Sequence, residues 1–181
     1  MGVNVKRQNH MNFDDWVKTV PSGITGDSLW KMRAYQLALF AADVGWNDVT
    51  KLARDHRTQS LSDQLYRSLG SIGANLAEGY SYGTGPNRAR MYEYSLGSAR
   101  ESRDWYYKGR HILSPEVTAH RIAFMSRIVQ LLLVTVPDQR GKVLRENNAM
   151  YEVEIQSPEV NDFEILPSLD QLLMNAPIID V

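Results

Sequence analysis

The sequence predicts an all-α fold, an antiparallel up-down four-helix bundle with an N-terminal leader and an acidic C-terminal extension. Three observations support this prediction. Apolar residues recur three and four positions apart in four segments of helical length. Capping and turn residues leave only short connections between these segments, which favours antiparallel neighbours. The 181 residues are 43% hydrophobic and 23% charged, values that suit one domain with a core and tails.

The leader is expected to cover residues 1–27, because Pro21-Ser22-Gly23 and Gly26 interrupt any helix there. The bundle is expected to cover residues 28–145. Asp27 or Ser28 can cap its first helix with a side-chain oxygen, and the helix should run to about Arg54. Its amphipathic stripe is Leu29, Met32, Gln36, Leu39, Phe40, Asp43 and Trp46.

The second helix can be capped by Thr58 or Ser60. Gly70 and Gly73 lie inside it, and each costs about 1 kcal/mol relative to alanine, which suggests a close backbone approach or a bend. The glycines between Gly79 and Gly85 should end the helix in a flexible loop. They do not form a phosphate-binding P-loop, because no strand precedes them and no Gly-Lys-Ser/Thr follows. The apolar stripe is Leu61, Leu65, Leu69, Ile72 and Leu76.

The third helix should begin near Pro86 or Asn87, and the fourth at Pro115 with Ser114 as its cap. Pro137 is expected to stop or kink the fourth helix, with a further short helical segment reaching Val143. The third stripe is weakly apolar: Met91, Tyr94, Ser95, Ser98, Ser102 and Trp105. The fourth is Val117, Phe124, Ile128, Leu131 and Thr135, with Arg121 as its odd member.

Residues 146–181 form the acidic extension. The alternation over Tyr151–Ile155 predicts a short strand. The stretch from Ile165 to Met174 is amphipathic, and such a motif can dock on a partner or on the chain's own body. Its apolar members are Leu166, Leu169, Leu172 and Leu173.

Charge is distributed unevenly along the chain. All 20 Lys and Arg lie at or before Arg145, together with 13 of the 21 acidic residues, so this part carries +7. The last 36 residues carry −8. A basic body favours an anionic partner, whereas the alternative is that the tail only neutralises or solubilises the body.

Arginine and lysine gather around the third helix, and tyrosine and tryptophan interleave with them. This mixture suits phosphate contact and base stacking, and so predicts binding of RNA or DNA. The alternative is a solvated helix face with ion pairs to neighbouring residues. The expected nucleic-acid-binding residues are Arg54, Arg57, Arg88, Arg90, Arg100, Arg103, Lys108 and Arg110.

A second group of polar residues shares one face of the second helix. Gln64, Arg67, Asn75 and Glu78 lie at helical spacing, and Glu101 lies on the third helix. We expect a structural polar network between the two helices, with Arg67 paired to Glu101 or Glu78, because buried charges in bundles are normally paired. A ligand or catalytic pocket is the alternative.

No pattern indicates an enzyme, a metal site or a cofactor. There is no cysteine, no Glu-x-x-His repeat of a di-metal bundle, and no nucleophile–base pair. The histidines, His10, His56, His111 and His120, lack the spacing of a zinc site. The first 20 residues hold no apolar run and the longest run, Ile128–Val136, is too short to span a membrane, so a cytoplasmic protein is expected.

One block of the second helix, Ser71-Ile-Gly-Ala-Asn-Leu-Ala-Glu-Gly79 after Gln64-Leu-Tyr-Arg67, resembles a known family. It is similar to the four-helix-bundle proteins encoded in intervening sequences of 23S ribosomal RNA genes. The accessory variability determinant of diversity-generating retroelements belongs to the same superfamily. A second block, Tyr94-Ser-Leu-Gly-Ser-Ala-Arg-Glu101, also resembles it. Gly73 replaces the family's proline, and Tyr66 replaces the second arginine of its Arg-Arg pair.

The resemblance covers about residues 29–136 and implies a pentameric ring, RNA binding and a reverse transcriptase partner. With the charge pattern, it leads to the hypothesis of a non-catalytic, RNA-favoured nucleic-acid-binding oligomeric scaffold, accessory to a reverse transcriptase. The alternative is a protein–protein adaptor whose acidic tail recruits a partner.

Overall fold

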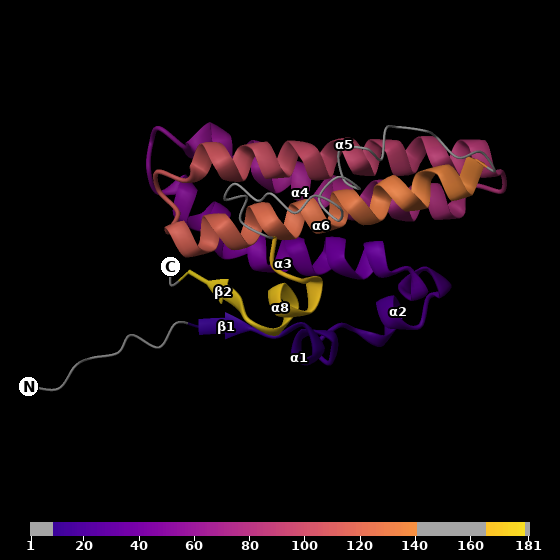
Figure 1. Ribbon diagram of the computed structural model, residues 1–181, viewed down its shortest axis with the longest axis horizontal. Helices are drawn as coiled ribbons and strands as arrows, with labels where there is room; N and C mark the ends of the chain where they lie inside the picture. Colours follow the sequence, from indigo (N-terminus) through magenta and orange to yellow (C-terminus); the bar gives the residue numbers. More distant parts are fainter. Residues whose placement is uncertain (1–8, 141–165, 180–181) are drawn as a thin grey trace, which may run out of the picture.

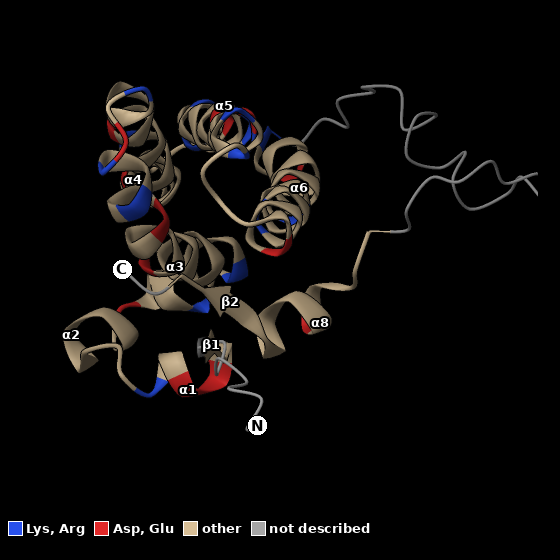
Figure 2. Ribbon diagram, turned by 90° about the vertical axis from the view of Figure 1, so that its left-hand side faces the viewer, with Lys and Arg blue, Asp and Glu red and all other residues tan. Residues whose placement is uncertain are grey.

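The computed structural model describes residues 9–140 and 166–179 (Figure 1). Four long helices dominate this part of the chain and follow one another through short connections. Seen along their axes, they surround a common core (Figure 2). The predicted all-α four-helix bundle is therefore confirmed. The four helices are α3 (Arg33–Ala53), α4 (Gln59–Ser81), α5 (Gly85–Gly109) and α6 (Pro115–Arg140).

Most boundaries of the four helices lie close to those expected from caps and breakers. The expected cap of the first helix is wrong, because Asp27 caps the 3₁₀ turn Ser28–Lys31 and α3 begins at Arg33. Arg54 is the C-cap of α3 and Thr58 the N-cap of α4. The Ser114 hydroxyl accepts a hydrogen bond from the Val117 amide at 3.2 Å, which caps α6. The expected stop or kink at Pro137 is wrong in one respect, because α6 continues through this residue to Arg140.

The buried face of α3 differs from the predicted stripe. Trp46 is 57% exposed, although it was expected in the core. The buried face carries Leu37, Val44 and Leu52, which the predicted stripe omitted, together with small residues such as Ala38 and Ala41. Asp48 also lies on this face and is 0% exposed. The prediction for α5 was wrong in the same way at Tyr94, which is 48% exposed.

Two buried serine contacts join α4 and α5. The Ser95 hydroxyl donates to the carbonyl oxygen of Ile72, and the hydroxyls of Ser68 and Ser102 are 2.9 Å apart. Small residues allow the two backbones to approach, and these hydrogen bonds satisfy the buried hydroxyls. The weakly apolar stripe of α5 therefore still forms a packed interface.

The close backbone approach lies at a different glycine from the two expected. A Cβ at Gly79 would lie 2.7 Å from Tyr92 Cε1 and 2.8 Å from Met91 Cβ. Gly70 has nothing within 4 Å, and Gly73 has only ordinary van der Waals neighbours. Within α4, the position that requires a missing side chain is thus Gly79, which packs against α5.

The terminal segments form a second layer against α3 and α6 (Figure 1). The expectation that no helix forms in the leader is wrong, because two short helices lie within residues 9–27. Strand β1 pairs antiparallel with β2, with Met11 opposite Ala176. The layer comprises β1 (Asn9–Met11), α1 (Phe13–Val17), α2 (Ser22–Thr25), the 3₁₀ turn η1 (Ser28–Lys31), α8 (Leu169–Met174) and β2 (Ala176–Ile178).

Aromatic side chains fix this layer to the bundle. The ring centroids of Phe13 and Phe40 are 5.3 Å apart, and those of Trp16 and Phe40 are 5.2 Å apart. Phe124 of α6 packs on Phe40 from the other side. Such edge-on pairs add to the stabilisation from buried area. The N-terminal layer and the bundle consequently share one hydrophobic core.

The C-terminal motif docks on the chain's own body. Leu172 and Leu173 are buried in the shared core, whereas Met174 is 58% exposed. Ser168 and Gln171 form a capping box at the start of α8. The strand expected at Tyr151–Ile155 and the segment expected to reach Val143 lie outside the described residues.

Among the described helices, α6 alone is long and apolar enough to suit a membrane span by length and composition. In the fold it is a core helix, since 56% of its apolar window is buried inside the bundle.

Candidate nucleic-acid interface

The eight cations expected to bind nucleic acid lie at three places in the bundle. Arg110 is the C-cap of α5, Arg54 is the C-cap of α3, and Arg57 lies in the connection between α3 and α4. Basic and acidic positions both occur along α5 (Figure 2). The remaining five lie within α5 itself: Arg88, Arg90, Arg100, Arg103 and Lys108.

Three cation–aromatic pairs occur along α5 and its C-cap. A cation over an aromatic face is attracted by the negative potential of the ring, and this contact holds the cation at the surface. Tyr94 and Tyr107 remain 48% and 54% exposed. The distances from cation to ring centroid are 5.9 Å for Arg90 over Tyr94, 4.2 Å for Lys108 over Trp105 and 4.0 Å for Arg110 over Tyr107.

Acidic residues balance part of this charge. Lys108 pairs with Asp104 one turn away, and Glu93 pairs with Arg140 of α6. Glu101 accepts a hydrogen bond from Trp105 Nε1 at 3.1 Å and so orients the indole. The surface is therefore mixed in sign, with exposed cations held beside exposed rings.

Two of the expected cations are held within the bundle. Arg88 donates to Gln139 of α6 at 3.2 Å and to the carbonyl oxygen of Tyr82 at 2.9 Å. Arg103 donates to the Ser126 hydroxyl of α6 at 3.3 Å. Both are half-buried, so they position helices and contribute less to the exposed surface.

The predicted polar network between α4 and α5 is not formed. Arg67 is exposed and donates to the carbonyl oxygen of Asp63, within its own helix. Glu78 accepts from the Tyr82 hydroxyl, and Glu101 from Trp105, again within single helices. These residues lie on outer faces, where water solvates their charges without a partner on the other helix. Gln64 and Asn75 are half-buried on α4.

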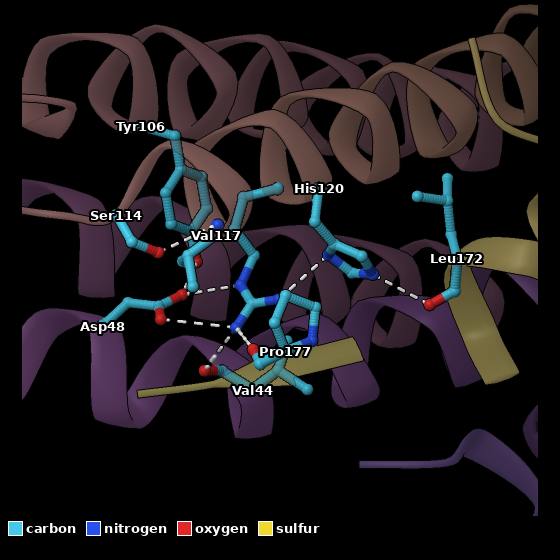
Figure 3. Close-up of polar contacts among 9 residues, drawn as sticks. Val44, Asp48, Tyr106, Ser114, Val117, His120, Leu172 and Pro177 are labelled. Carbon is cyan, nitrogen blue, oxygen red and sulfur yellow. Dashed lines mark hydrogen bonds and ion pairs between the residues drawn. The ribbon is translucent and has the colours of Figure 1, made fainter. Parts of the chain in front are cut away.

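A buried network does exist, but it joins other elements (Figure 3). Arg121 of α6 is 0% exposed and donates through Nε to Asp48 Oδ2 at 2.7 Å. The Tyr106 hydroxyl of α5 donates to the same oxygen at 3.0 Å. Arg121 also donates to the carbonyl oxygen of Pro177 in β2 at 2.7 Å. Three helices and the C-terminal strand thus meet at one guanidinium.

His120 extends this network to α8 (Figure 3). Its Nε2 lies 2.8 Å from the carbonyl oxygen of Leu172, and its Nδ1 lies 2.9 Å from Arg121 Nη1. Both contacts are satisfied when Nε2 carries the proton and Nδ1 accepts, so the neutral tautomer is assigned. Burial, together with the charge of Arg121, lowers the pKa of His120 to about 4.

The same environment shifts two other groups. Burial and the neighbouring Asp48 raise the pKa of the Tyr106 hydroxyl well above its ordinary value. Burial opposes the charged form of Arg121, yet Asp48 and Tyr106 raise its pKa. Because Arg121 and Asp48 are both 0% exposed, the network holds elements together and does not meet a substrate.

The sequence placed Arg121 on the apolar stripe of the fourth helix but did not indicate its partners Asp48 and Pro177. Asp48 follows Leu37, Ala41 and Val44 at spacings of four, three and four, and this pattern could have placed it on the buried face. No group of three His, Asp or Glu side chains that could hold a metal ion occurs within the described part of the chain.

Comparison with known proteins gives one match. A family model described as 23S rRNA-intervening sequence protein matches residues 31–132, which include α3, α4, α5 and most of α6. This is more than half of the chain. No curated protein and no solved structure matches.

Proposed function

The chain belongs to the family of 23S rRNA-intervening sequence proteins, and we propose that it is a non-catalytic protein that binds RNA through the outer surface of α5. The observation that carries the proposal is the set of three cation–aromatic pairs along this helix and its C-cap. Cations neutralise phosphates, and exposed rings stack on bases. The family membership agrees with the resemblance seen in the Asn75–Gly79 block.

The salt dependence of binding tests this proposal. Each phosphate contact to a single strand contributes about 0.7 to the slope of log affinity against log salt. The double variant Arg90→Gln/Lys108→Gln should therefore lower that slope by about 1.4. Fluorescence anisotropy of a labelled single-stranded RNA at several salt concentrations measures it.

A matched control removes the same charge elsewhere. Lys18 and Lys31 are exposed cations outside the four long helices, and Lys18→Gln/Lys31→Gln should leave the slope unchanged. An equal fall of the salt slope in both double variants would show a general charge effect and contradict a site on α5. Absence of binding to the unaltered protein even at low salt would contradict RNA binding altogether.

We further propose that the chain assembles with copies of itself as a pentamer, serves a reverse transcriptase and acts in the cytoplasm. The pentamer and the reverse transcriptase partner rest on the resemblance to the retroelement accessory proteins and not on a contact in the structure, whereas the cytoplasmic location rests on the sequence pattern. Native mass spectrometry tests the assembly, and a monomer at micromolar concentration would contradict it. Co-purification with a reverse transcriptase encoded nearby tests the partner.

In the adaptor hypothesis, the acidic tail recruits a protein partner. Leu172 and Leu173 are buried in the chain's own core, which leaves Leu166 and Met174 as the exposed apolar members among the described residues of the motif. Deleting all of residues 146–181 would remove part of this core, so it is not a clean test. Replacing residues 146–164 with a Gly/Ser linker of equal length removes six acidic residues and keeps α8 and β2. Tighter RNA binding would favour electrostatic competition, whereas loss of a captured protein would favour the adaptor.

A further inference from the structure

The connection between α3 and α4 and the connection between α5 and α6 lie at the same end of the bundle. A Cβ built on Gly109 would lie 3.2 Å from Leu52, so the two chain reversals are in close contact. Between them is a hollow of about 440 Å³, lined by Lys51, Arg54, Asp55, His56 and Ile112. This volume falls in the range of sites for small molecules.

The only acid lining the hollow among the described residues is already neutralised. Asp55 Oδ1 accepts from the backbone N–H and from Nε of Arg57, each at 2.9 Å. Its Oδ2 faces Arg57 Nη2. These hydrogen bonds lower the pKa of Asp55 far below its ordinary value, so the carboxylate stays charged and engaged with Arg57.

The two cations in the hollow have no such partner. Within the described residues, neither Lys51 nor Arg54 makes an ion pair or a side-chain hydrogen bond. Lys51 is half-buried at the edge of the hollow, and Arg54 is exposed at the C-cap of α3. His56 projects beside them with 91% of its side chain exposed. The lining therefore presents two uncompensated positive charges.

This arrangement selects a particular chemistry. A guanidinium and an ammonium that line the same hollow suit the oxygens of a phosphate group. Ile112 adds an apolar wall, and the hollow is larger than a phosphate needs. We propose that the hollow binds a phosphate monoester carried by a nucleotide, either a free mononucleotide or the 5′-terminal phosphate of an RNA strand. The strand-end form rests on the proposed function, whereas the mononucleotide form does not.

Isothermal titration of the full chain with AMP, and with adenosine as the matched ligand without phosphate, tests the site. AMP should bind at least about tenfold more tightly than adenosine, because adenosine has no phosphate to accept charge-assisted hydrogen bonds. Lys51→Gln/Arg54→Gln should remove this preference, and Lys51→Arg/Arg54→Lys should retain it. Lys31→Gln is the control and should bind AMP as the unaltered chain does.

Two strands of equal sequence, with a 5′-phosphate or a 5′-hydroxyl, separate the two sources of the phosphate. Preference for the phosphorylated strand that disappears in Lys51→Gln/Arg54→Gln supports the strand end. Binding of AMP without binding of either strand supports the phosphate site in the hollow and contradicts RNA binding by α5. Equal binding of AMP and adenosine, no binding of AMP, or an unaffected glutamine variant whose circular dichroism shows a folded chain would overturn the site.

Discussion

The substitution Arg121→Met should destabilise the protein strongly. It removes the guanidinium that neutralises Asp48 and leaves that carboxylate buried, with the Tyr106 hydroxyl as its remaining side-chain donor in the described structure. It also leaves the carbonyl oxygen of Pro177 without its donor. Methionine fills most of the volume, so the effect measures charge and hydrogen bonding more than a cavity.

The expected loss is about 3–5 kcal/mol in the free energy of unfolding, the range for breaking one partner of a buried ion pair. For a chain of this length, that corresponds to a fall in Tm of about 6–20 °C. Urea unfolding at pH 7.5, followed by far-ultraviolet circular dichroism, measures the loss. The double variant Arg121→Met/Asp48→Leu should recover most of it, because no unpaired buried charge remains.

Arg67→Met is the matched control. Arg67 is exposed on α4 and bonds only within its own helix, so its replacement should change stability by less than about 0.5 kcal/mol. A loss below about 1 kcal/mol for Arg121→Met, well under the cost of breaking a buried ion pair, would refute the role given to this network. A large loss for Arg67→Met would instead restore the network first expected between α4 and α5.

Three further predictions concern stability. Because the pKa of His120 is about 4 in the fold and about 6.5 when unfolded, its contribution of about 3 kcal/mol is present above pH 6.5 and is lost as the pH falls towards 4. Urea titrations at pH 7.5 and 4.5 should show a smaller pH dependence in His120→Gln, and an identical dependence would contradict the assigned tautomer. Gly79→Ala should cost about 1–3 kcal/mol of stability because the new Cβ meets Tyr92, whereas Gly70→Ala should gain up to about 1 kcal/mol. Shifts of the melting temperature in the same direction for both variants, relative to the unaltered protein, would contradict the packing described. Truncation after residue 165 should cost at least about 3 kcal/mol, since Leu172 and Leu173 each contribute about 1.5–3 kcal/mol by burial, and an unchanged urea midpoint would show that α8 and β2 do not dock.

Periodicity and capping were sufficient to predict the four helices. Ser114 and Pro115 act locally, in the first turn of α6, so their effect can be read from the sequence. The Thr58 hydroxyl instead donates to the carbonyl oxygen of Leu52 and makes no capping hydrogen bond to α4. The face that each helix buries was less predictable. Alanines and serines can pack closely against another helix, and exposed aromatic rings such as Trp46 obscure the pattern.

The partners of charged residues depended on long-range geometry. Arg121 and Asp48 are 73 residues apart, and nothing local links them. The docking of α8 and β2 depends on Arg127 as well, which donates to the carbonyl oxygens of Leu166 and Pro167. For the candidate interface, the sequence indicated the cations on α5, but only the fold separates exposed Arg90 from half-buried Arg103.

Ultraviolet cross-linking of single-stranded RNA to the protein, with the linked residues found by mass spectrometry, tests RNA binding by α5 most directly. The protein carries its own control, because Trp46 and Tyr66 form an exposed aromatic pair on α3 and α4 with centroids 5.6 Å apart. We predict cross-links at Tyr94 and Tyr107, and their loss in high salt. Cross-links confined to Trp46 and Tyr66, or spread equally over both surfaces, would contradict the assignment of the interface to α5.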